Sequence, residues 1–367
     1  MFYKAFQNTR ISALGMGCMR FPVDDGNDAK INRIQAQKII DAAMEGGITY
    51  YDTAYIYHAG NSESFLGDAL GRYPRESYQL ATKFYVAANP DIASVFEEQL
   101  RRCKTEYFDF YLLHSVSEEY APQFMDEQKN YLGYLLEQKE KGRIRYLGFS
   151  SHAHPELLTR FLKWYNGFDM AQIQLNYLDW SLLDAKQQYE IISSYNIPIW
   201  VMEPLKGGTL CNLVPEAAAI LQKAAPKRSL ASWAFRYLMG LTHVQTILSG
   251  MSDLEQLADN LATFEQPAPL NEDEQKALQQ ALEIMLKNLG VPCTGCRYCC
   301  PVCPVKLNIP YILKGYNEQK LTGDAWRLDG LAAMPHGAAD CLHCGACSKR
   351  CPQQIDIPGV MRKIAAG

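Results

Sequence analysis

The sequence predicts an α/β protein, with a (β/α)8 barrel of the TIM type over residues 1–285 and a small cysteine-rich domain over residues 286–367. Three observations support this prediction. Short apolar runs alternate with segments of helical period, polar residues stand at the ends of several of these runs, and the cysteines gather near the C-terminus. The chain has 367 residues, of which 48% are hydrophobic, and this is enough for two domains and a large core.

Eight apolar runs are predicted to be the strands of the barrel, after a short polar hairpin expected over residues 3–11. The runs cover residues 13–18, 48–53, 78–83, 108–114, 144–150, 170–175, 198–202 and 244–248. Segments of helical period lie between most of them, as over residues 33–45, 92–103, 125–141 and 155–165. Eight strand–helix units match a barrel. A doubly wound sheet is the alternative, but it more often has about five or six strands, and no G-x-G-x-x-G follows an early strand.

Charge and hydropathy limit the partners that we expect. The net charge is -4 and charges of both signs are dispersed, so nucleic acid is not implied as a partner. No apolar run approaches the roughly 18 residues of a membrane-spanning helix, and the first residues lack the apolar segment of a signal peptide. We therefore expect a soluble, cytoplasmic protein with no membrane partner.

One cysteine spacing occurs twice near the C-terminus. The motifs are Cys293-x2-Cys296-x2-Cys299-x3-Cys303-Pro304 and Cys341-x2-Cys344-x2-Cys347-x3-Cys351-Pro352. Thiolates are the soft ligands that iron favours, and in this pattern the fourth cysteine of each motif ligates the cluster of the other motif. We assign one [4Fe-4S] cluster to Cys293, Cys296, Cys299 and Cys351, and a second to Cys341, Cys344, Cys347 and Cys303.

Two other interpretations of the cysteines are weaker. A pair of zinc sites also uses C-x2-C, but these motifs would leave zinc with surplus ligands. A disulfide framework would be expected in a secreted protein, which nothing here indicates. Cys300 is a ninth cysteine in this region, and it is either a small buried residue or a redundant ligand. The region resembles a bacterial two-cluster ferredoxin module over about its last 75 residues.

Similar apolar stretches follow the two cysteine motifs, at residues 308–310 and 356–358. We interpret them as an internal pseudo-repeat of strand–turn units. Residues 311–326, between the two motifs, are expected to form a helix and a loop insertion.

Polar residues with catalytic potential stand at the ends of three successive predicted strands. They are Asp52 with Tyr57 shortly after it, Lys83, and His114. Taken singly, each is more often a cap or a packed polar residue. In a barrel of this type the C-terminal ends of the strands meet at one mouth, so we expect the four to converge there.

This constellation resembles the aldo/keto reductase family over roughly residues 5–285. The residues that carry the resemblance are Asp52-Thr53-Ala54-x-x-Tyr57, Ser62-Glu63, Thr82-Lys83, Leu112-Leu113-His114, Gly148-Phe149-Ser150, Ser249-Gly250 and Asn260. The run Met202-Glu203-Pro204-Leu205-Lys206-Gly207-Gly208, together with Cys293-Thr294-Gly295-Cys296, is similar to the subgroup fused to a ferredoxin tail.

Reduction of a carbonyl by hydride needs an acid that protonates the developing alkoxide, and Tyr57 is the candidate. A free tyrosine titrates near 10. One cation about 4 Å away contributes on the order of 4 kcal/mol at an effective dielectric near 20, so we expect Lys83 to bring the pKa of Tyr57 toward neutrality. Asp52 would hold the ammonium, and His114 would polarise the carbonyl oxygen. The nearby side chains that form either substrate walls or rim packing are Tyr55, His58, Phe84 and Tyr85.

The resemblance also implies a nicotinamide cofactor, NADP(H) or NAD(H). It assigns the carboxamide to Ser150 and Gln174, and it places Met202 where relatives carry a stacking aromatic residue. NADP-selective relatives have Lys and Arg at the positions of Gly250 and Gln256, so this chain lacks a guanidinium for the 2′-phosphate and coenzyme choice stays open. The cofactor-binding residues expected on this basis are Met19, Arg20, Asp52, Ser150, Gln174, Met202, Pro204, Leu205, Gly250, Ser252, Gln256 and Asn260.

We predict an oxidoreductase that interconverts a carbonyl and an alcohol, with electrons exchanged through two clusters. A hydride carries two electrons whereas a [4Fe-4S] cluster passes one. A flavin could mediate, but no flavin motif is present. Two alternatives remain, namely a reductase with purely structural clusters and a non-catalytic electron-transfer or redox-sensing protein. A redox partner protein is an open expectation, and substrate identity and oligomeric state are not predicted.

Overall fold

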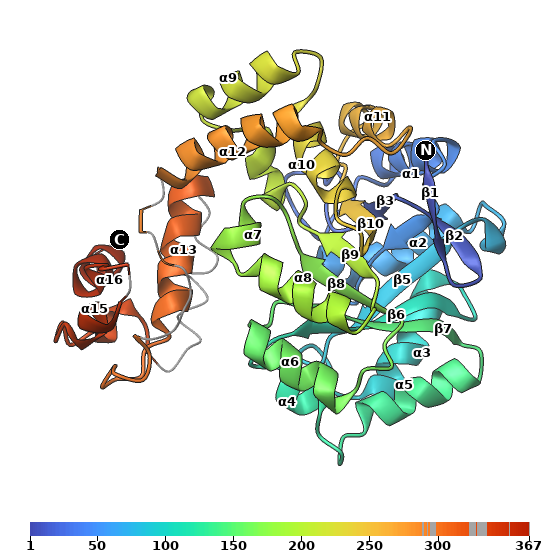
Figure 1. The fold of residues 1–367 in the computed structure, drawn as a ribbon. Coiled ribbons are helices and arrows are strands. Elements are labelled where there is room, and N and C mark those ends of the chain that lie inside the picture. Colours follow the sequence, from blue (N-terminus) through green and yellow to red (C-terminus); the bar gives the residue numbers. More distant parts are fainter. Residues whose placement is uncertain are drawn as a thin grey trace. The chain divides into compact units, whose positions relative to one another are not determined.

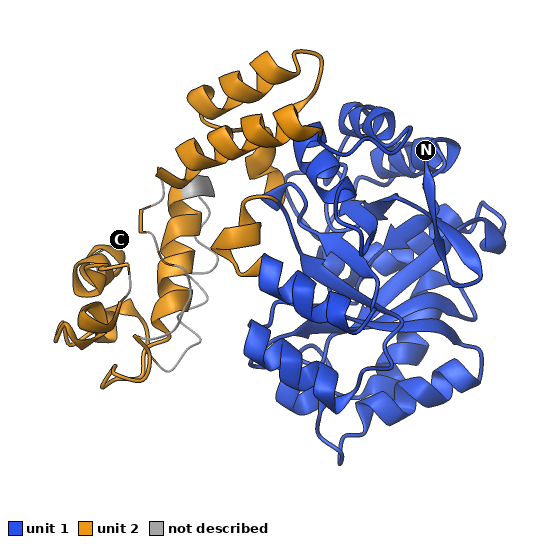
Figure 2. Ribbon diagram, in the orientation of Figure 1, with its two compact units in different colours: residues 1–176, 186–206, 231–270 blue, residues 177–185, 207–230, 271–367 orange. Residues whose placement is uncertain are grey.

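The computed structural model describes residues 1–287, 290–291, 293, 299–322, 328, 336–351 and 353–366. Cys296, and Pro352 of the second motif, lie outside these residues. The chain forms two compact units, shown in blue and orange in Figure 2. Unit 1 comprises residues 1–176, 186–206 and 231–270, and unit 2 comprises residues 177–185, 207–230 and 271–367.

Unit 1 contains a closed barrel of eight parallel strands, which confirms the predicted fold class (Figure 1). The order around the barrel is β10-β3-β4-β5-β6-β7-β8-β9. The strands are β3 (Leu14–Gly17), β4 (Tyr50–Asp52), β5 (Gln79–Phe84), β6 (Phe108–Val116), β7 (Ile144–Ser151), β8 (Met170–Gln174), β9 (Ile199–Met202) and β10 (Val244–Ser249). Each lies within a residue or two of a predicted apolar run, because strands buried on both faces read as continuous apolar segments.

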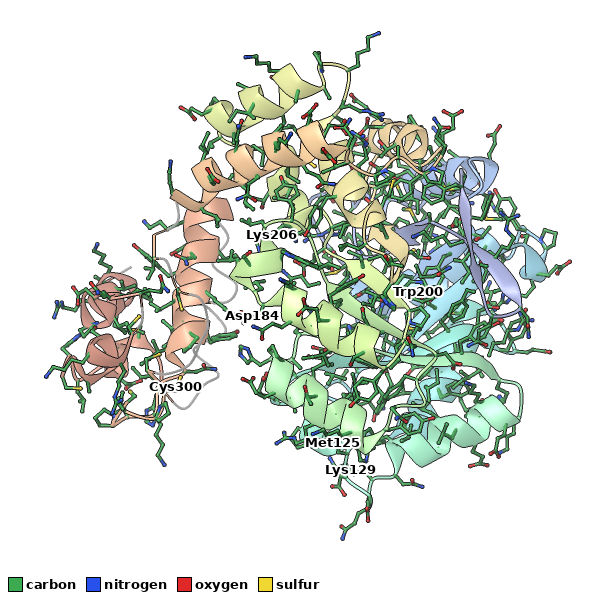
Figure 3. The ribbon with its side chains drawn as sticks, in the orientation of Figure 1. Met125, Lys129, Asp184, Trp200, Lys206 and Cys300 are labelled. Atoms are coloured by element: carbon green, nitrogen blue, oxygen red, sulfur yellow. The ribbon has the colours of Figure 1, made fainter. Side chains whose placement is uncertain are left out.

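The predicted N-terminal hairpin pairs β1 (Tyr3–Phe6) with β2 (Thr9–Ser12), and its apolar end packs on the barrel. The Phe6 ring lies 4.9 Å from the Tyr146 ring and 5.1 Å from that of Trp200, both in edge-on geometry. Trp200 is fully buried within β9 (Figure 3). Such aromatic pairs add about 0.5–1.5 kcal/mol each beyond the area they bury. The hairpin therefore contributes directly to the core below the strands.

Helices connect the strands of unit 1. They are α1 (Arg33–Glu45), α2 (Asn61–Leu70), α3 (Ile92–Cys103), α4 (Ala121–Phe124), α5 (Tyr131–Glu140), α6 (Pro155–Trp164), α8 (Ala185–Ser194), α10 (Leu230–Met239) and α11 (Leu254–Thr263), with short 3-10 turns η1 (Tyr57–Gly60) and η2 (Arg75–Ser77). The starts of α1 and α3 follow from side-chain caps, since Asn32 accepts from Gln35 N and Asp91 accepts from Ser94 N.

One predicted helix was too long. The segment 125–141 becomes helical only at Tyr131, where α5 begins, and a separate short helix, α4, precedes it. Asn130 has a φ of 48° in the left-handed region, which asparagine tolerates better than most residues. This conformation interrupts the helical path, although the apolar period continues through it.

Unit 2 gathers segments that are distant in sequence. Its elements are α7 (Asp179–Leu182), η3 (Lys206–Cys211, whose first residue belongs to unit 1), α9 (Pro215–Ala224), α12 (Glu272–Lys287), α13 (Ile309–Thr322), η5 (Ala338–Asp340), α15 (Ala346–Arg350) and α16 (Ile357–Ala365). Helices α9 and α12 pack together. A separate core forms near the cysteines, around residues such as Leu307, Ile312 and Met361.

Two segments of unit 2 continue directly from barrel strands. Residues 177–185 follow β8, and residues 207–230 follow β9. Lys314 of α13 donates to Asp184 at 3.0 Å, and their side chains are only 8% and 14% exposed. This pair ties the segment that follows β8 to the helix that follows the first cysteine motif. The compact units thus differ from the two predicted domains, 1–285 and 286–367. The domain boundary at residue 285 stays a prediction.

The strand–turn interpretation of residues 308–310 and 356–358 was wrong, because both stretches begin helices, α13 and α16. Asp356 Oδ1 accepts from Gly359 N at 3.1 Å, and Pro358 lies in the first turn. A capping side chain followed by proline is a typical helix start, so the sequence did contain the correct signal. The helix expected within residues 311–326 is confirmed by α13, and residues 323–327 lie outside the described residues.

In the part of the chain that the structure describes, every helix is too short or too polar to cross a lipid bilayer.

Candidate active site

The four predicted catalytic residues come together at the C-terminal ends of neighbouring strands. Asp52 ends β4, Lys83 lies near the end of β5 and His114 lies in β6, while Tyr57 begins the 3-10 turn η1 after β4. Strands β4, β5 and β6 pair in this order in the barrel. Lys83 is fully buried and Asp52 is 2% exposed.

Lys83 is the hub of the site. Its ammonium donates to Asp52 Oδ1 at 2.6 Å, to the carbonyl of Thr53 at 2.6 Å and to the phenolic oxygen of Tyr57 at 3.4 Å. An ammonium has three protons, so these acceptors use all of them. Because the Tyr57 oxygen accepts from Lys83, its own O–H is left to donate to another group.

The buried ion pair keeps the ammonium charged. Burial by itself lowers the pKa of Lys83, but Asp52 and Tyr57 outweigh burial and raise that pKa above its usual value. Burial raises the pKa of Asp52 against the opposing effect of Lys83. Removing one partner of a buried pair typically costs about 3–5 kcal/mol, so each residue depends on the other.

The expected effect of Lys83 on Tyr57 is smaller than the effect of burial. Burial raises the pKa of Tyr57 above 10, and Lys83 lowers it by less than burial raises it. The expectation that Lys83 brings this pKa toward neutrality was therefore wrong for the protein without bound cofactor, because it left out the loss of hydration. Tyr57 stays protonated at neutral pH, which suits a proton donor.

His114 lies edge-on beside the Tyr57 ring. Its ring is 6.0 Å from the Tyr57 ring and 5.2 Å from the Tyr85 ring. Burial, with Lys83 and His152 as further causes, holds the pKa of His114 well below its usual value. The imidazole is therefore neutral, and its buried Nδ1 has no hydrogen-bond partner among the described residues. A neutral imidazole can donate one N–H to a carbonyl oxygen.

The four predicted wall residues divide between two roles. Tyr85 faces His114, and its hydroxyl lies 3.0 Å from that of Tyr120, a residue that the sequence did not single out. His58 is buried and accepts from Phe21 N at 3.2 Å, which is the packing role. The two remaining side chains also pack: Phe84 is fully buried, and Tyr55 donates to Glu98 at 2.8 Å.

Sequence reasoning named Glu63 and Thr82 as residues typical of the family, but it missed Gln99 and the buried polar network that the three form behind Lys83. Gln99 donates to Glu63 at 2.6 Å and to the Lys83 carbonyl at 3.1 Å, and Thr82 donates to Glu63 at 2.6 Å. Glu63, Thr82 and Gln99 are all fully buried. The network fixes the backbone on both sides of the Lys83 side chain. A glutamine on the apolar face of α3 was the available signal, but sequence alone does not show what it contacts.

A second missed residue, Gln172, lies next to the residues assigned to the carboxamide. Its Nε2 is 3.9 Å from the Met202 sulfur, and its buried Oε1 has no partner among the described residues. Ser150 Oγ accepts from Ser115 N at 2.8 Å and keeps its proton for donation. Gln174 follows Gln172 by two residues in β8, so the two share one side of the strand. An amide with free hydrogen-bonding capacity fits a carboxamide.

The residues expected at the other end of the cofactor are also neighbours. Ser252 donates to the carbonyl of Arg20 at 2.7 Å, and Asn260 donates to Ser249 at 3.1 Å. A Cβ on Gly250 would lie 2.9 Å from Arg20 Cγ, so glycine permits this close approach. Met19 is 50% exposed beside Arg20. The remaining two residues of this set follow β9 directly; Pro204 is buried and Leu205 is half-buried.

Gln256 is engaged in the start of α11. Its amide donates to Asp253 Oδ2 at 2.8 Å and accepts from Ser252 N at 2.9 Å, while its backbone N–H donates to Asp253 Oδ1 at 2.8 Å. Asp253 and Glu255 are exposed. The start of α11 therefore presents two exposed carboxylates and an amide whose oxygen and nitrogen are both already hydrogen-bonded.

Three cysteines of the second motif share a pocket with one cysteine of the first. Cys303, Cys341, Cys344 and Cys347 line one pocket whose other walls are largely apolar, including Leu307. Gly345 has a φ of 73°, which glycine adopts without strain between two of these cysteines. Four thiols in a largely apolar lining are the donors that a [4Fe-4S] cluster requires, and the role of Cys303 as the exchanged ligand stays a prediction.

Part of the other predicted cluster site is described. Cys299 is buried, and the pKa of its thiol is raised by a hydrogen bond with Cys300 and by burial, with Cys293 as a further neighbour. Cys351 is half-buried at the edge of the same core. Cys296 lies outside the described residues, so its place in this set stays a prediction.

Comparison with known proteins agrees with this geometry. The model of the aldo/keto reductase family matches residues 13–283. The chain belongs to the aldo/keto reductase family. A second model, that of a 4Fe-4S dicluster domain, matches residues 292–355. The protein is thus an aldo/keto reductase with a C-terminal ferredoxin-like iron–sulfur domain, as predicted.

Among its relatives is an uncharacterized oxidoreductase, YqkF, of Bacillus subtilis, 26% identical over 304 residues, which span 73% of this chain and 92% of that protein. An NADH-specific methylglyoxal reductase of Escherichia coli is 25% identical over 308 residues, spanning 69% and 90%. The holo form of aldo-keto reductase AKR11C1 from Bacillus halodurans superposes with a TM-score of 0.63 at 26% identity, covering 77% of this chain and 96% of that one.

The pKa directions predict how carbonyl reduction depends on pH. Because burial raises the pKa of Tyr57, we expect kcat/KM to stay flat through neutral pH and to fall only above about pH 10, as the proton donor is lost.

Replacing Lys83 with methionine should lower kcat/KM by about 100-fold or more, and should move the alkaline fall to higher pH because the cation no longer favours the phenolate. A pH–rate profile with a step near pH 6.5 would contradict a neutral His114.

Proposed function

We propose that the barrel reduces small carbonyl compounds with a nicotinamide coenzyme, and that Tyr57 is the proton donor. The observation that carries this proposal is the saturation of Lys83, whose three hydrogen bonds leave the Tyr57 O–H as the donor at the mouth. The nicotinamide supplies the hydride when it is bound. Ser150 and Gln172 would hold its carboxamide, with Gln174 and Met202 beside them.

The roles of the chain's own residues follow from their protonation states. Neutral His114 donates an N–H to the substrate oxygen and withdraws electron density from the carbonyl carbon. Tyr57 then transfers its proton to that oxygen as negative charge develops. Lys83, held by Asp52, stabilises the phenolate that remains. Tyr85, with its hydroxyl next to that of Tyr120, would form a wall of the substrate site beside His114.

We further propose that the coenzyme is NADH. The 2′-phosphate of NADPH would meet Asp253 and Glu255, and the amide of Gln256 is already used in capping α11. Two carboxylates, with no lysine or arginine among residues 250–256, disfavour a dianionic phosphate at this turn and suit a ribose hydroxyl. The NADH-specific relative of Escherichia coli is consistent with this choice.

In the C-terminal domain we propose two [4Fe-4S] clusters with exchanged fourth ligands, Cys303 and Cys351. The pocket formed by Cys303, Cys341, Cys344 and Cys347 supports one of these sets. Each cluster would pass one electron at a time, so the two clusters together would carry the two electrons of one hydride. Electron exchange with the barrel is part of this proposal, and purely structural clusters are its competitor. A cytoplasmic location is proposed with it, because the ligating thiols must stay reduced.

Replacement of Tyr57 with phenylalanine tests the catalytic assignment. We expect NADH-dependent reduction of methylglyoxal or a similar small aldehyde to fall by about 100-fold or more, because the proton donor is removed. NADH affinity, measured by fluorescence, should change little. The matched control is Tyr55→Phe, which removes a hydroxyl two residues away that bonds Glu98. If both variants retain full activity, Tyr57 is not the donor.

Coenzyme choice is tested by comparing KM for NADH and NADPH. We expect the wild-type protein to prefer NADH by about tenfold or more, since phosphate and carboxylates repel each other. Gln256→Arg should lower KM for NADPH while leaving KM for NADH nearly unchanged. The control for the added charge is Gln279→Arg, at an exposed position of α12. A wild-type preference for NADPH would overturn the assignment.

The cluster ligands are tested by iron and sulfide analysis of anaerobically purified protein. We expect wild-type protein to hold about eight irons, and Cys303→Ala to lose the cluster shared with the second motif. Cys300→Ala should keep the full iron content, because its neighbours already supply the ligands. Equal iron loss in the two variants would show that Cys300 is a ligand.

A further inference from the structure

The two cysteine motifs differ in their exposure to solvent. In the first, Cys299 is 8% exposed. In the second, Cys347 is buried but Cys344 is exposed, and the two residues before Cys344 are exposed as well, with Leu342 at 62%. Among the described residues, the solvent-facing ligand edge is therefore that of Cys344.

An exposed leucine by itself means little, because single apolar residues are common on protein surfaces. Leu342 differs in its position, since it stands between two proposed ligands, Cys341 and Cys344, and lines the same pocket as both. A side chain there can contact a partner without displacing any packing of the domain. It gives the exposed edge a small apolar centre.

The charges around this edge are mostly basic. In the described segments 299–309 and 336–366, the exposed basic residues are Lys306, Lys349, Arg350, Arg362 and Lys363. The exposed acidic residues are Asp340 and Asp356, and both are turned to their own backbone, with Asp340 accepting from Gly337 N and Asp356 from Gly359 N. The whole chain has a net charge of -4, so this edge has the opposite sign.

Four of these basic residues lie on α15 and α16, which lie side by side (Figure 1). Ile357 N donates to Ser348 Oγ at 3.1 Å, which joins the start of α16 to α15. Pro358 and Met361 of α16 line the pocket of Cys344, as Cys347 of α15 does, and Arg362 and Lys363 are exposed on α16. The charges therefore lie on the two helices that contribute to the pocket lining.

We propose that this surface, made of Leu342, Cys344, Lys349, Arg350, Arg362 and Lys363, docks an acidic one-electron carrier protein. The inference rests on the proposed function, because it requires a cluster at Cys344. A cluster held at Cys344 would exchange one electron with the carrier in each encounter, so that one of the two would be oxidised as the other is reduced. A small apolar centre with a charged rim suits a weak, electrostatically steered contact of this kind.

The test uses the full, cluster-loaded chain under anaerobic conditions and an acidic flavodoxin as the probe. Binding is measured by calorimetry at low and high salt. We expect binding that weakens as salt rises, and we expect the double variant Arg362→Glu/Lys363→Glu to weaken it by roughly tenfold or more at low salt. The matched control is Lys227→Glu/Arg228→Glu, an exposed adjacent pair between α9 and α10, which should bind as the wild type does.

Leu342→Ala is a second variant, which removes apolar surface without changing the charge. It should weaken binding while leaving the salt dependence unchanged. Equal effects of the two charge pairs, or binding that is insensitive to both Arg362→Glu/Lys363→Glu and Leu342→Ala, would overturn the proposal. Iron content and NADH-dependent carbonyl reduction are measured in the same samples. Carrier binding with the expected charge pattern supports the docking surface even where no carbonyl is turned over, so the two proposals fail separately.

Discussion

The buried ion pair between Lys83 and Asp52 is the constraint on which the site depends. An ammonium without water needs three acceptors, and the barrel provides them from the end of β4 and from the turn η1 that follows it. Because the Tyr57 oxygen is one of these acceptors, the Tyr57 O–H points away from Lys83. The network of Glu63, Thr82 and Gln99 then fixes the backbone of Lys83 itself. Charge, hydrogen bonding and strand position thus support a single arrangement of the catalytic groups.

Burial sets the protonation states around this pair. It raises the pKa of Tyr57 and lowers that of His114, so that both groups are neutral hydrogen-bond donors at the mouth. Such a site is prepared to protonate an oxygen. In the proposed function a nicotinamide coenzyme would supply the hydride, and the carboxylates of Asp253 and Glu255 would bear on the choice between NADH and NADPH.

The C-terminal domain is joined to the barrel by more than the chain end. The segments that follow β8 and β9 belong to the same compact unit as the cysteines, and Lys314 pairs with Asp184 within it. Through the continuity of the chain, these segments lead back to Gln174 and Met202.

The sequence alone determined the barrel, because eight buried strands leave eight apolar runs, and it determined the family through residues at strand ends. The paired cysteine motifs likewise predicted the iron–sulfur domain from spacing. Only the tertiary structure showed Gln172, Gln99 and Tyr120 beside the site, because their contacts join segments far apart in the chain. The direction of the Tyr57 pKa shift also required the fold, since it depends on how much water burial removes. The grouping of residues 177–185 with the cysteine region depended on packing, which no local pattern encodes.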